Sequence, residues 1–249
     1  MEQKRILTMQ DLSCYGKCSL SMSTAILSAC GHEAVALPTA LLSSHTSEFK
    51  GYTFLDLSCE DDKIIEHFQK LGLSFDAIVI GYLGSLSLIE RAKKIIEIFG
   101  DGAVVVVDPA MAENDVLYTG FDLSYVNAMK NLCEMADFIT PNTSEVKLLG
   151  DVKGTSVLQT GVEKDRMIGI RAGEKEWLKP AIDGQFYGAG DAFTSAFAGL
   201  YLKTGCLEKA IEGALEFVWE SINKTLDEKD KYWYGTKFEQ NLGFLTNFQ

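Results

Sequence analysis

The chain has 249 residues, of which 47% are apolar and 23% charged, and this composition excludes a disordered or collagen-like protein. Lys and Arg together number 23, and Asp and Glu number 35, so the formal net charge is −12. Because an acidic surface repels phosphate backbones and anionic lipids, the composition disfavours binding to nucleic acid or to a membrane surface.

The first residues of the chain and its cysteines indicate its cellular compartment. Residues 1–5 lead directly into the apolar run 6–9, a pattern that predicts no secretory signal. No stretch approaches the roughly 18 apolar residues of a membrane-spanning helix. The six cysteines lack the spacing of a zinc site. These features together predict a cytoplasmic protein with reduced thiols.

Short apolar runs alternate with amphipathic stretches along the chain. The runs predict strands at residues 6–9, 34–37, 77–80, 103–107, 138–140 and 156–159. Helical periodicity predicts helices at residues 61–71, 86–99, 123–136 and 207–226. The run Val104–Val107 has no polar alternation, which is typical of a central strand covered on both faces.

This alternation predicts an α/β protein with a mostly parallel central sheet and helices on both faces. We see no internal repeat and no linker rich in Pro or Gly, so residues 1–249 are expected to form a single domain. The segment 39–54 is rich in Ser, Thr and Gly, and we expect it to form a loop or small hairpin over a site.

Polar residues follow several predicted strands at the same end. They are Asp11 and Ser13, Gly81 and Tyr82, Asp108 and Pro109, Pro141 and Asn142, and Thr160 and Gly161. In an open parallel sheet, ligands bind beyond the carboxyl ends of the strands. Five such sets at one edge of the sheet predict a cleft there.

The strongest local motif is Gly188-Ala189-Gly190-Asp191, followed by a helix rich in small residues. A glycine turn that begins a helix presents unpaired N–H groups and the positive end of the helix dipole to an anion. Asp191 can simply complement that dipole. It also suits phosphoryl transfer, because a carboxylate beside an anion site can deprotonate an attacking hydroxyl. The motif lacks the Lys-Ser/Thr ending of a P-loop.

These residues resemble the GAGD signature of the ribokinase-like superfamily, and in particular its vitamin B6 branch, the pyridoxal kinases. Four further segments resemble that branch: Ser44-His45-Thr46, the strand that ends in Gly81-Tyr82, Asp108-Pro109 with Leu117-Tyr118, and Thr140-Pro141-Asn142 with Glu145. The resemblance runs in order from about Ile6 to Thr225. It implies a three-layer α/β/α sandwich.

The resemblance also implies an activity and a role for each matching residue. The activity is phosphorylation of the 5′-hydroxymethyl group of pyridoxal, pyridoxine or pyridoxamine, a reaction that salvages pyridoxal phosphate. It requires ATP and Mg²⁺, a monovalent cation such as K⁺ is plausible, and the branch usually forms homodimers. The implied roles are as follows: catalytic base, Asp191; anion hole, Gly188, Ala189 and Gly190; substrate pocket, Asp11, Ser13, His45, Thr46 and Tyr82; nucleotide site, Asn142 and Thr160; metal site, Asp108 and Glu145.

Each of these residues also has a simpler interpretation. Asp108 and Pro109 can form only a turn that ends a strand, and Tyr82 can be a half-buried core aromatic. Asn142 and Glu145 can cap a helix that starts after Pro141. Cys14 and Cys18 lie near the predicted mouth and can attack an aldehyde, although nothing in the sequence indicates a lowered thiol pKa.

The chain departs from the family pattern in three respects. Glu113 stands where many members have Asp, with Ala112 in place of Gly, and Ala189 stands where this branch often has Thr. The segments near residues 150–156 and 177–186 are also short. A parallel crossover needs about a dozen residues or more, so residues 141–156 barely suffice.

Two other functions stay open. A hydroxymethylpyrimidine kinase shares the fold and acts on a similar heteroaromatic alcohol, and a non-catalytic relative would bind pyridoxal phosphate or a nucleotide without turnover. An oxidoreductase is disfavoured, because no GxGxxG follows the first predicted strand.

Overall fold

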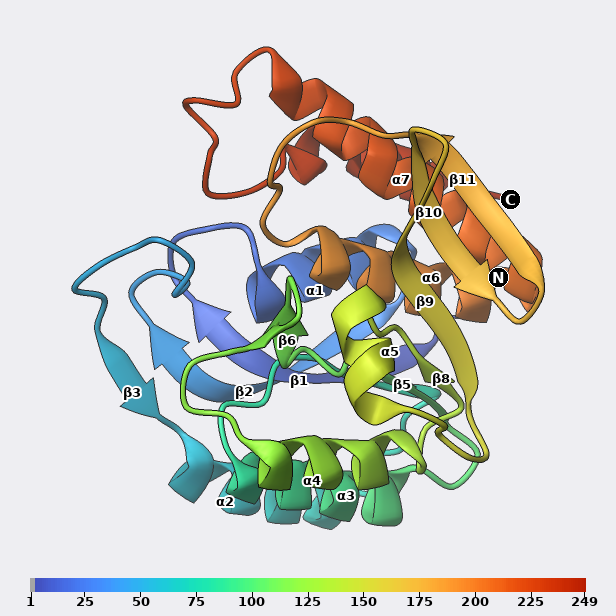
Figure 1. Cartoon of the computed structure of the whole chain (residues 1–249). Coiled ribbons are helices and arrows are strands. Elements are labelled where there is room, and N and C mark those ends of the chain that lie inside the picture. The colour runs from blue at the N-terminus through green and yellow to red at the C-terminus, as the bar shows by residue number, and fades with distance from the viewer. Residues whose placement is uncertain (1–2) are drawn as a thin grey trace.

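A computed structural model describes residues 3–249 of the chain (Figure 1). In chain order its elements are β1 (Arg5–Ser13), α1 (Ser19–Ala29), β2 (Glu33–Leu42), β3 (Phe54–Asp56), α2 (Ser58–Lys70), β4 (Ala77–Ile80), α3 (Leu86–Phe99), β5 (Val104–Val107), β6 (Ala112–Glu113), β7 (Val116–Leu117), α4 (Leu123–Cys133), β8 (Phe138–Ile139), α5 (Thr143–Leu149), β9 (Ser156–Lys164), β10 (Met167–Ala172), β11 (Lys175–Pro180), α6 (Ala189–Thr204), α7 (Leu207–Leu226), the 3-10 helix η1 (Phe238–Asn241) and α8 (Leu242–Asn247).

A nine-stranded sheet runs through the molecule in the order β11-β10-β9-β8-β5-β4-β1-β2-β3. The six strands from β9 to β2 in this order are mutually parallel, and β3 at one edge and the β10–β11 hairpin at the other are antiparallel. The mostly parallel sheet expected from the sequence is confirmed.

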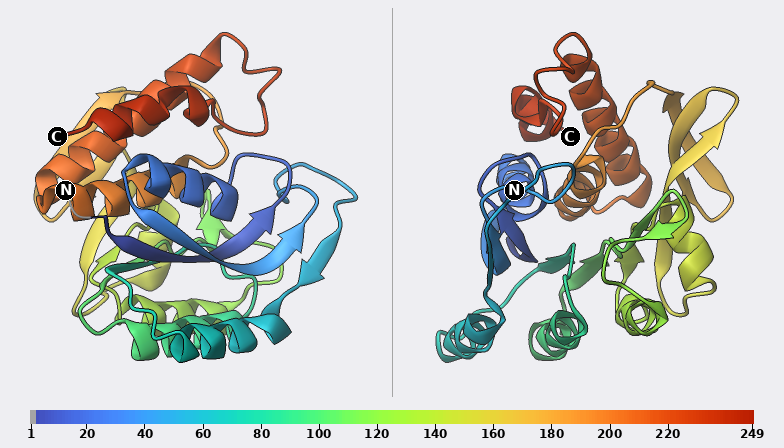
Figure 2. Two further views of the ribbon diagram at one scale, coloured as in Figure 1. Left: turned by 180° about the vertical axis from the view of Figure 1, so that it is seen from behind. Right: turned by 60° about the vertical axis from the view of Figure 1, so that its left-hand side comes forward.

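Helices cover both faces of this sheet, which gives three layers (Figure 2). Helices α2, α3 and α4 lie on one face, and α1, α6, α7 and α8 lie on the other. The core is correspondingly divided into two apolar clusters, one on each face of the sheet. The structure therefore confirms the α/β/α sandwich.

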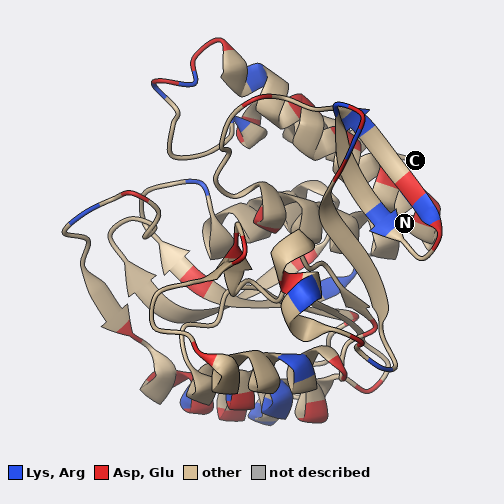
Figure 3. Ribbon diagram, viewed as in Figure 1, with Lys and Arg blue, Asp and Glu red and all other residues tan. Residues whose placement is uncertain are grey.

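Burial explains why the central strands read as unbroken apolar runs. All four residues of β4 are buried, as are the last three of β5, because helices pack on both sides of them. Acidic and basic residues instead mix along the helices and on the β10–β11 hairpin (Figure 3). No helix within residues 3–249 is long and apolar enough to cross a bilayer.

The predicted helices 86–99 and 207–226 match α3 and α7 in both bounds. The first predicted strand is too short, because β1 continues to Ser13, so Asp11 and Ser13 lie inside this strand. Thr160 likewise lies inside β9. The segment 39–54 forms the small hairpin that was expected, since Leu42 pairs with Phe54 in antiparallel β2 and β3. Helix α1 and the β10–β11 hairpin were not predicted.

The short segment 141–156 does complete a parallel crossover. It contains the seven-residue helix α5, which links β8 to β9 in parallel register with Phe138 opposite Ser156. The other short segment, 177–186, contains the end of β11 and a loop that leads to α6.

The buried aromatic cluster between α6 and β8 gives a test of the fold. Phe197 is fully buried, and its ring centroid lies 5.2 Å from that of Phe138 and 5.8 Å from that of Tyr201. We expect Phe197→Ala to lower the free energy of unfolding by about 3–5 kcal/mol, because it leaves a cavity in a packed core. Urea denaturation measures this change. Leu123→Ala, at a position that is 71% exposed, is the control and should change stability by about 0.5 kcal/mol or less.

Candidate active site

The parallel strands bring the predicted polar positions to one edge of the sheet. Chain segments that follow neighbouring strands stay in register there, since Gly81 N–H donates to Met9 O and Asp108 N–H donates to Ile80 O. The main chains of Asn142 and Thr160 form a further parallel bridge beyond β8. Residues from β1, β4, β5, β8 and β9 therefore meet at the carboxyl ends of the strands, as expected.

The turn before α6 requires glycine at position 188. Gly188 has a φ of +78°, and a Cβ there would lie 2.1 Å from the main-chain oxygen of Lys17. Helix α6 begins at the next residue, so the N–H groups of its first turn have no partner within the helix. Because Gly190 is exposed, this helix start is open to an anion.

Asp191 lies in the first turn of α6 and accepts a hydrogen bond of 3.0 Å from the main-chain N–H of Ser19 to its Oδ2. Ser19 has a φ of +51°, which is a strained conformation for a residue other than glycine. Burial raises the pKa of Asp191 to about 6, the Ser19 hydrogen bond opposes that shift, and the charge of Asp11 adds to it. A carboxyl group with this pKa is a base near neutral pH.

Asp11 is buried at the end of β1, where its Oδ2 accepts a 3.0 Å hydrogen bond from Ser13 Oγ. Burial raises the pKa of Asp11, and hydrogen bonds from the Ser19 and Ser13 hydroxyls partly offset this rise. The charge of Asp11 also acts on Asp191, Tyr82 and His45. Asp11 and Ser13 therefore lie close to the predicted base.

Asp108 follows β5 and faces the same turn from the other side. A Cβ on Gly190 would lie 3.6 Å from Asp108 Oδ2, and Thr194 Oγ1 donates to that oxygen at 3.3 Å. The Thr194 hydroxyl also lies 2.7 Å from that of Thr140. Burial raises the pKa of Asp108 well above its usual range, and the charges of Glu145 and Asp191 raise it further.

Asn142 and Glu145 form a capping box at the start of α5, which confirms the simpler interpretation of this pair. Asn142 Oδ1 accepts from the N–H groups of Ser144 and Glu145, and Asn142 Nδ2 donates to Ala112 O. The Glu145 carboxylate accepts N–H groups from Asn142 and, across the β6–β7 hairpin, from Met111 and Ala112. Burial nevertheless raises the pKa of Glu145 to about 7.

The charges of Glu145 and Asp191 both act on the buried carboxylate of Asp108, and a cation would relieve that repulsion. Within residues 3–249, no three His, Cys, Asp or Glu side chains form a ready cage for a metal ion. Mg²⁺ usually keeps several waters and takes only one or two protein carboxylates together with substrate phosphates. The donor set therefore fits a hydrated Mg²⁺, and the assignment of Asp108 and Glu145 as its ligands stays a prediction.

Tyr82 is half-buried and belongs to an aromatic group on the β4 side of the site. Its ring centroid lies 6.0 Å from that of Phe121 and 6.4 Å from that of Tyr118. Burial and the charge of Asp11 raise the pKa of Tyr82, so its hydroxyl stays protonated. This arrangement offers an aromatic face next to a buried carboxylate, which suits a protonated or hydrogen-bonding heteroaromatic ring.

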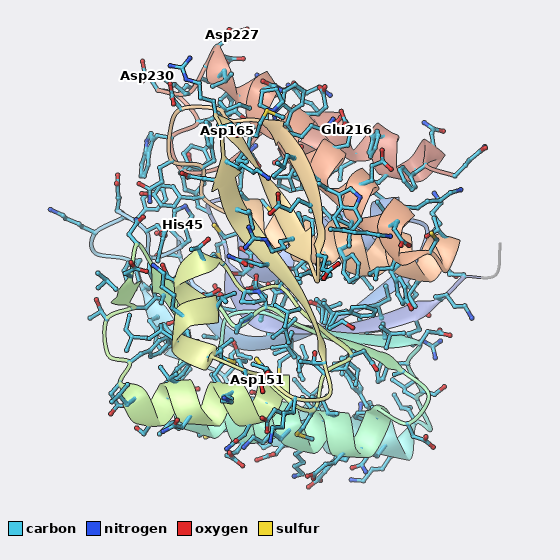
Figure 4. All side chains as sticks on the ribbon, turned by 45° about the vertical axis from the view of Figure 1, so that its right-hand side comes forward. His45, Asp151, Asp165, Glu216, Asp227 and Asp230 are labelled. Atoms are coloured by element: carbon cyan, nitrogen blue, oxygen red, sulfur yellow. The ribbon has the colours of Figure 1, made fainter. Side chains whose placement is uncertain are left out.

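His45 and Thr46 lie in the loop 43–53 and differ in their surroundings. His45, labelled in Figure 4, is buried, donates from Nε2 to Tyr234 O at 2.9 Å, and accepts the Ser47 N–H at Nδ1. Burial lowers its pKa, so the ring is neutral. Thr46 is exposed. Because main-chain groups occupy both ring nitrogens of His45, this side chain ties the loop 43–53 to the segment 227–237.

A cavity of about 270 Å³ opens beside the glycine turn, between three loops. Its lining comes from the loop 43–53, the loop before α6 and the segment 227–237: Glu48, Gly184, Gln185, Phe186, Tyr187, Lys229, Asp230 and Trp233. Figure 4 labels Asp230 on this segment. The loop 43–53 borders this cavity through Glu48.

The two cysteines near the mouth are free thiols with different exposures. Cys14 is exposed, whereas Cys18 is buried directly before Ser19. Burial raises the pKa of Cys18, and the charges of Asp191 and Asp11 raise it further. A thiol in such surroundings is a poor nucleophile, so the structure disfavours attack on an aldehyde by Cys18.

Two residues of this site were missed in the sequence. Ser19 supplies the N–H that binds Asp191 over a separation of 172 residues, and no local pattern signals such a contact. Thr194 connects Asp108 to Thr140, and its place one turn after Asp191 on α6 was the available signal.

Comparison with known proteins identifies relatives over most of the chain. The model of a family described as phosphomethylpyrimidine kinase matches residues 22–164. A Schizosaccharomyces pombe protein provisionally named a pyridoxal kinase is 28% identical over 90% of this chain and 86% of its own length.

Solved structures are also similar. The pyridoxal kinase from Lactobacillus plantarum has a TM-score of 0.91 at 28% identity, over 98% of this chain and 97% of that one. A Bacteroides thetaiotaomicron protein provisionally named a phosphomethylpyrimidine kinase, solved in a form with pyridoxal, has a TM-score of 0.86 at 32% identity, over 98% of this chain and 96% of that one. A pyridoxal kinase from Leishmania donovani, solved with ADP, shares the fold at 18% identity and a TM-score of 0.85, over 99% of this chain and 97% of that one.

The buried carboxylate of Asp108 gives a prediction about stability. Its pKa is higher in the folded than in the unfolded chain, so the folded state loses stability as pH rises through the folded pKa. Without Mg²⁺, Asp108→Asn should therefore be more stable than the wild type at pH 8. We expect its free energy of unfolding to be higher by about 1 kcal/mol, which corresponds to about 2–4 °C in Tm.

Thermal unfolding at two pH values measures this effect. The difference between the two proteins should disappear near pH 4, and added Mg²⁺ should stabilise the wild type more than Asp108→Asn. A variant that is less stable than the wild type at pH 8 would contradict the prediction.

Proposed function

This chain belongs to the phosphomethylpyrimidine kinase family, and from that premise we propose that it transfers the γ-phosphoryl group of ATP to the 5′-hydroxymethyl group of a B6 vitamer. It is a phosphotransferase with an alcohol group as acceptor. The observation that carries the proposal is the position of Asp191, a partly desolvated carboxylate in the first turn of α6, opposite the buried Asp108. We take residues 1–249 to act as one kinase domain.

Asp191 acts as the general base in this mechanism. It accepts the proton of the substrate hydroxyl while the hydroxyl oxygen attacks phosphorus in line with the leaving ADP. The N–H groups of Gly188, Ala189 and Gly190 lie at the positive end of the α6 dipole and face the charge that develops on the transferred group. Ala189 lacks the hydroxyl that this branch often has, but its main-chain donor is retained.

Asp108, helped by Glu145, would hold Mg²⁺, which when bound supplies positive charge against the phosphates of the nucleotide. Thr194 orients the Asp108 carboxylate, and the capping box of α5 holds Glu145 in place. Asn142 and Thr160 form the neighbouring wall of the nucleotide site, since their main chains are bridged.

The substrate ring would lie between Tyr82 and the carboxylate pair Asp11 and Asp191, with Ser13 and Thr46 as polar contacts. His45 acts here by holding the loop 43–53. A B6 vitamer is supported by the relatives, because the Lactobacillus plantarum structure is named a pyridoxal kinase and the Bacteroides thetaiotaomicron structure includes pyridoxal.

Further properties follow from the same family resemblance. We propose a cytoplasmic homodimer that uses Mg²⁺ and binds K⁺ as a monovalent cation. Gel filtration with light scattering measures the assembly, and replacement of K⁺ by Na⁺ in the assay measures the cation dependence.

A hydroxymethylpyrimidine kinase is the second candidate, because the matching family model carries the name of a pyrimidine kinase. Both substrates present a hydroxymethyl group on a flat heteroaromatic ring. They differ in the ring substituents that would face Asp11, Ser13 and Thr46.

A protein that binds its ligand without turnover is the third candidate. Tight binding by calorimetry together with no ATP consumption in an assay would identify it.

A panel of substrates tests the proposal directly. With MgATP, we expect phosphorylation of at least one of pyridoxal, pyridoxine and pyridoxamine, at a kcat/KM above that for hydroxymethylpyrimidine. Asp191→Asn should lower kcat by about 10²–10⁴, because it removes the base but keeps the shape of the side chain. A near-normal rate in Asp191→Asn would exclude Asp191 as the base.

The pH dependence of the reaction gives a separate prediction. Because burial raises the pKa of Asp191 to about 6, the base is protonated in acid, and kcat/KM should fall about tenfold per pH unit below pH 6. Above that pH the rate should level off. Initial rates across pH 5–8 measure this profile, and the acid limb should be absent from the residual rate of Asp191→Asn.

A further inference from the structure

Lys17 makes an unusual set of contacts for a basic residue in a loop. Its side chain is only 14% exposed, and its Nζ lies 2.6 Å from Glu239 Oε2. The same Nζ lies 5.2 Å from the centroid of the Tyr232 ring and 5.8 Å from that of Phe238. A cation held by a carboxylate and two aromatic faces is fixed in position.

The partners of Lys17 are themselves anchored to the rest of the fold. Glu239 and Phe238 belong to η1, where Phe238 is buried and Asn241 Nδ2 donates to Phe217 O on α7. Gly235 leaves room for Lys17, since a Cβ at position 235 would lie 2.5 Å from Lys17 Cβ. The C-terminal segment thus surrounds the Lys17 side chain with Tyr232, Gly235, Phe238 and Glu239, and we call these four residues its socket. The Lys17–Glu239 ion pair joins residues that are 222 positions apart in the sequence.

The main chain of residues 17–19 contacts the start of α6, where the predicted base Asp191 lies. The Lys17 carbonyl oxygen contacts Gly188 so closely that no Cβ fits there. Two residues later, the Ser19 N–H binds Asp191 while Ser19 holds a left-handed φ. A strained main chain keeps such a conformation only where its surroundings enforce it.

We propose that Lys17 is a positioning residue for the reaction: its socket in the C-terminal segment fixes residues 17–19 so that the Ser19 N–H holds the Asp191 carboxylate in its productive orientation. The inference rests on the proposed function for its kinetic consequence. Its structural part, the dependence of the Ser19–Asp191 hydrogen bond on the Lys17 ion pair, stands independently of any substrate.

Amide hydrogen exchange at Ser19 tests the structural part. Asp191→Ala removes the hydrogen-bond acceptor, so the Ser19 exchange rate in this variant is the reference for an amide without that bond. Lys17→Met keeps the length of the side chain but loses its charge, and should raise the Ser19 rate at least about tenfold toward that reference. Lys17→Arg should restore protection, because a guanidinium also pairs with carboxylates and packs on aromatic rings.

Two further variants make the exchange test specific. Glu239→Gln breaks the same ion pair from the other side and should act like Lys17→Met. Lys175→Met breaks the Lys175–Glu208 ion pair of 2.9 Å on the exposed surface between β11 and α7, and it should leave Ser19 protected. Wild-type protection in both Lys17→Met and Glu239→Gln would overturn the inference.

Kinetics test the functional part. Lys17→Met should lower kcat by about 10–100-fold and change KM for either substrate by no more than about twofold, because a small displacement of a reacting group affects the chemical step. In the Asp191→Ala background, Lys17→Met should cost less than about twofold, since it acts through a carboxylate that is no longer there.

An equal cost in both backgrounds would overturn the positioning role. A wild-type protein that phosphorylates no vitamer would refute the proposed function instead, and the exchange rates of Ser19 would still decide whether Lys17 orients Asp191.

Discussion

The close approach of two main-chain segments, at Lys17 and Gly188, determines the geometry of the whole site. Only a residue without a Cβ fits at position 188, where φ is +78° and the Lys17 carbonyl is in contact. This contact sets where α6 begins and hence where its free N–H groups point. It also places the Ser19 N–H next to Asp191. A side chain at 188 would push the Lys17 main chain away from α6 and so separate the Ser19 N–H from Asp191.

The site concentrates negative charge in a largely buried place. Asp11, Asp108, Asp191 and Glu145 all have pKa values raised by burial. Such an arrangement costs folding stability at neutral pH, but it leaves a carboxylate with a pKa suited to accept a proton and a place that attracts a cation. The burial that lowers folding stability here is thus the same burial that raises the pKa values of these carboxyl groups.

The C-terminal part of the chain also contributes to the site. The segment 227–237 lies against the loop 43–53 through His45 and the rings of Phe49, Trp233 and Tyr234. Lys17 inserts into the same part of the molecule. The loop 43–53 and the main chain beside Lys17 are therefore both tied to residues 227–241, which follow α7 and pack against it.

The sequence by itself determined the layered fold, because long periodic helices such as 86–99 and continuous apolar strands such as Val104–Val107 require burial on definite faces. It also predicted the glycine turn before α6 and the polar strand ends, which depend on local chain geometry. It did not reveal α1, whose small and polar residues carry little periodicity, or the β10–β11 hairpin, which is rich in charge. The capping box of Asn142 and Glu145 was already among the interpretations open from the sequence, because it is a local pattern. Only the tertiary structure showed that His45 binds main chain, that the Ser19 N–H binds Asp191, and that Lys17 pairs with Glu239. These contacts join residues up to 222 positions apart, and only the packing of the complete chain brings them within hydrogen-bonding distance.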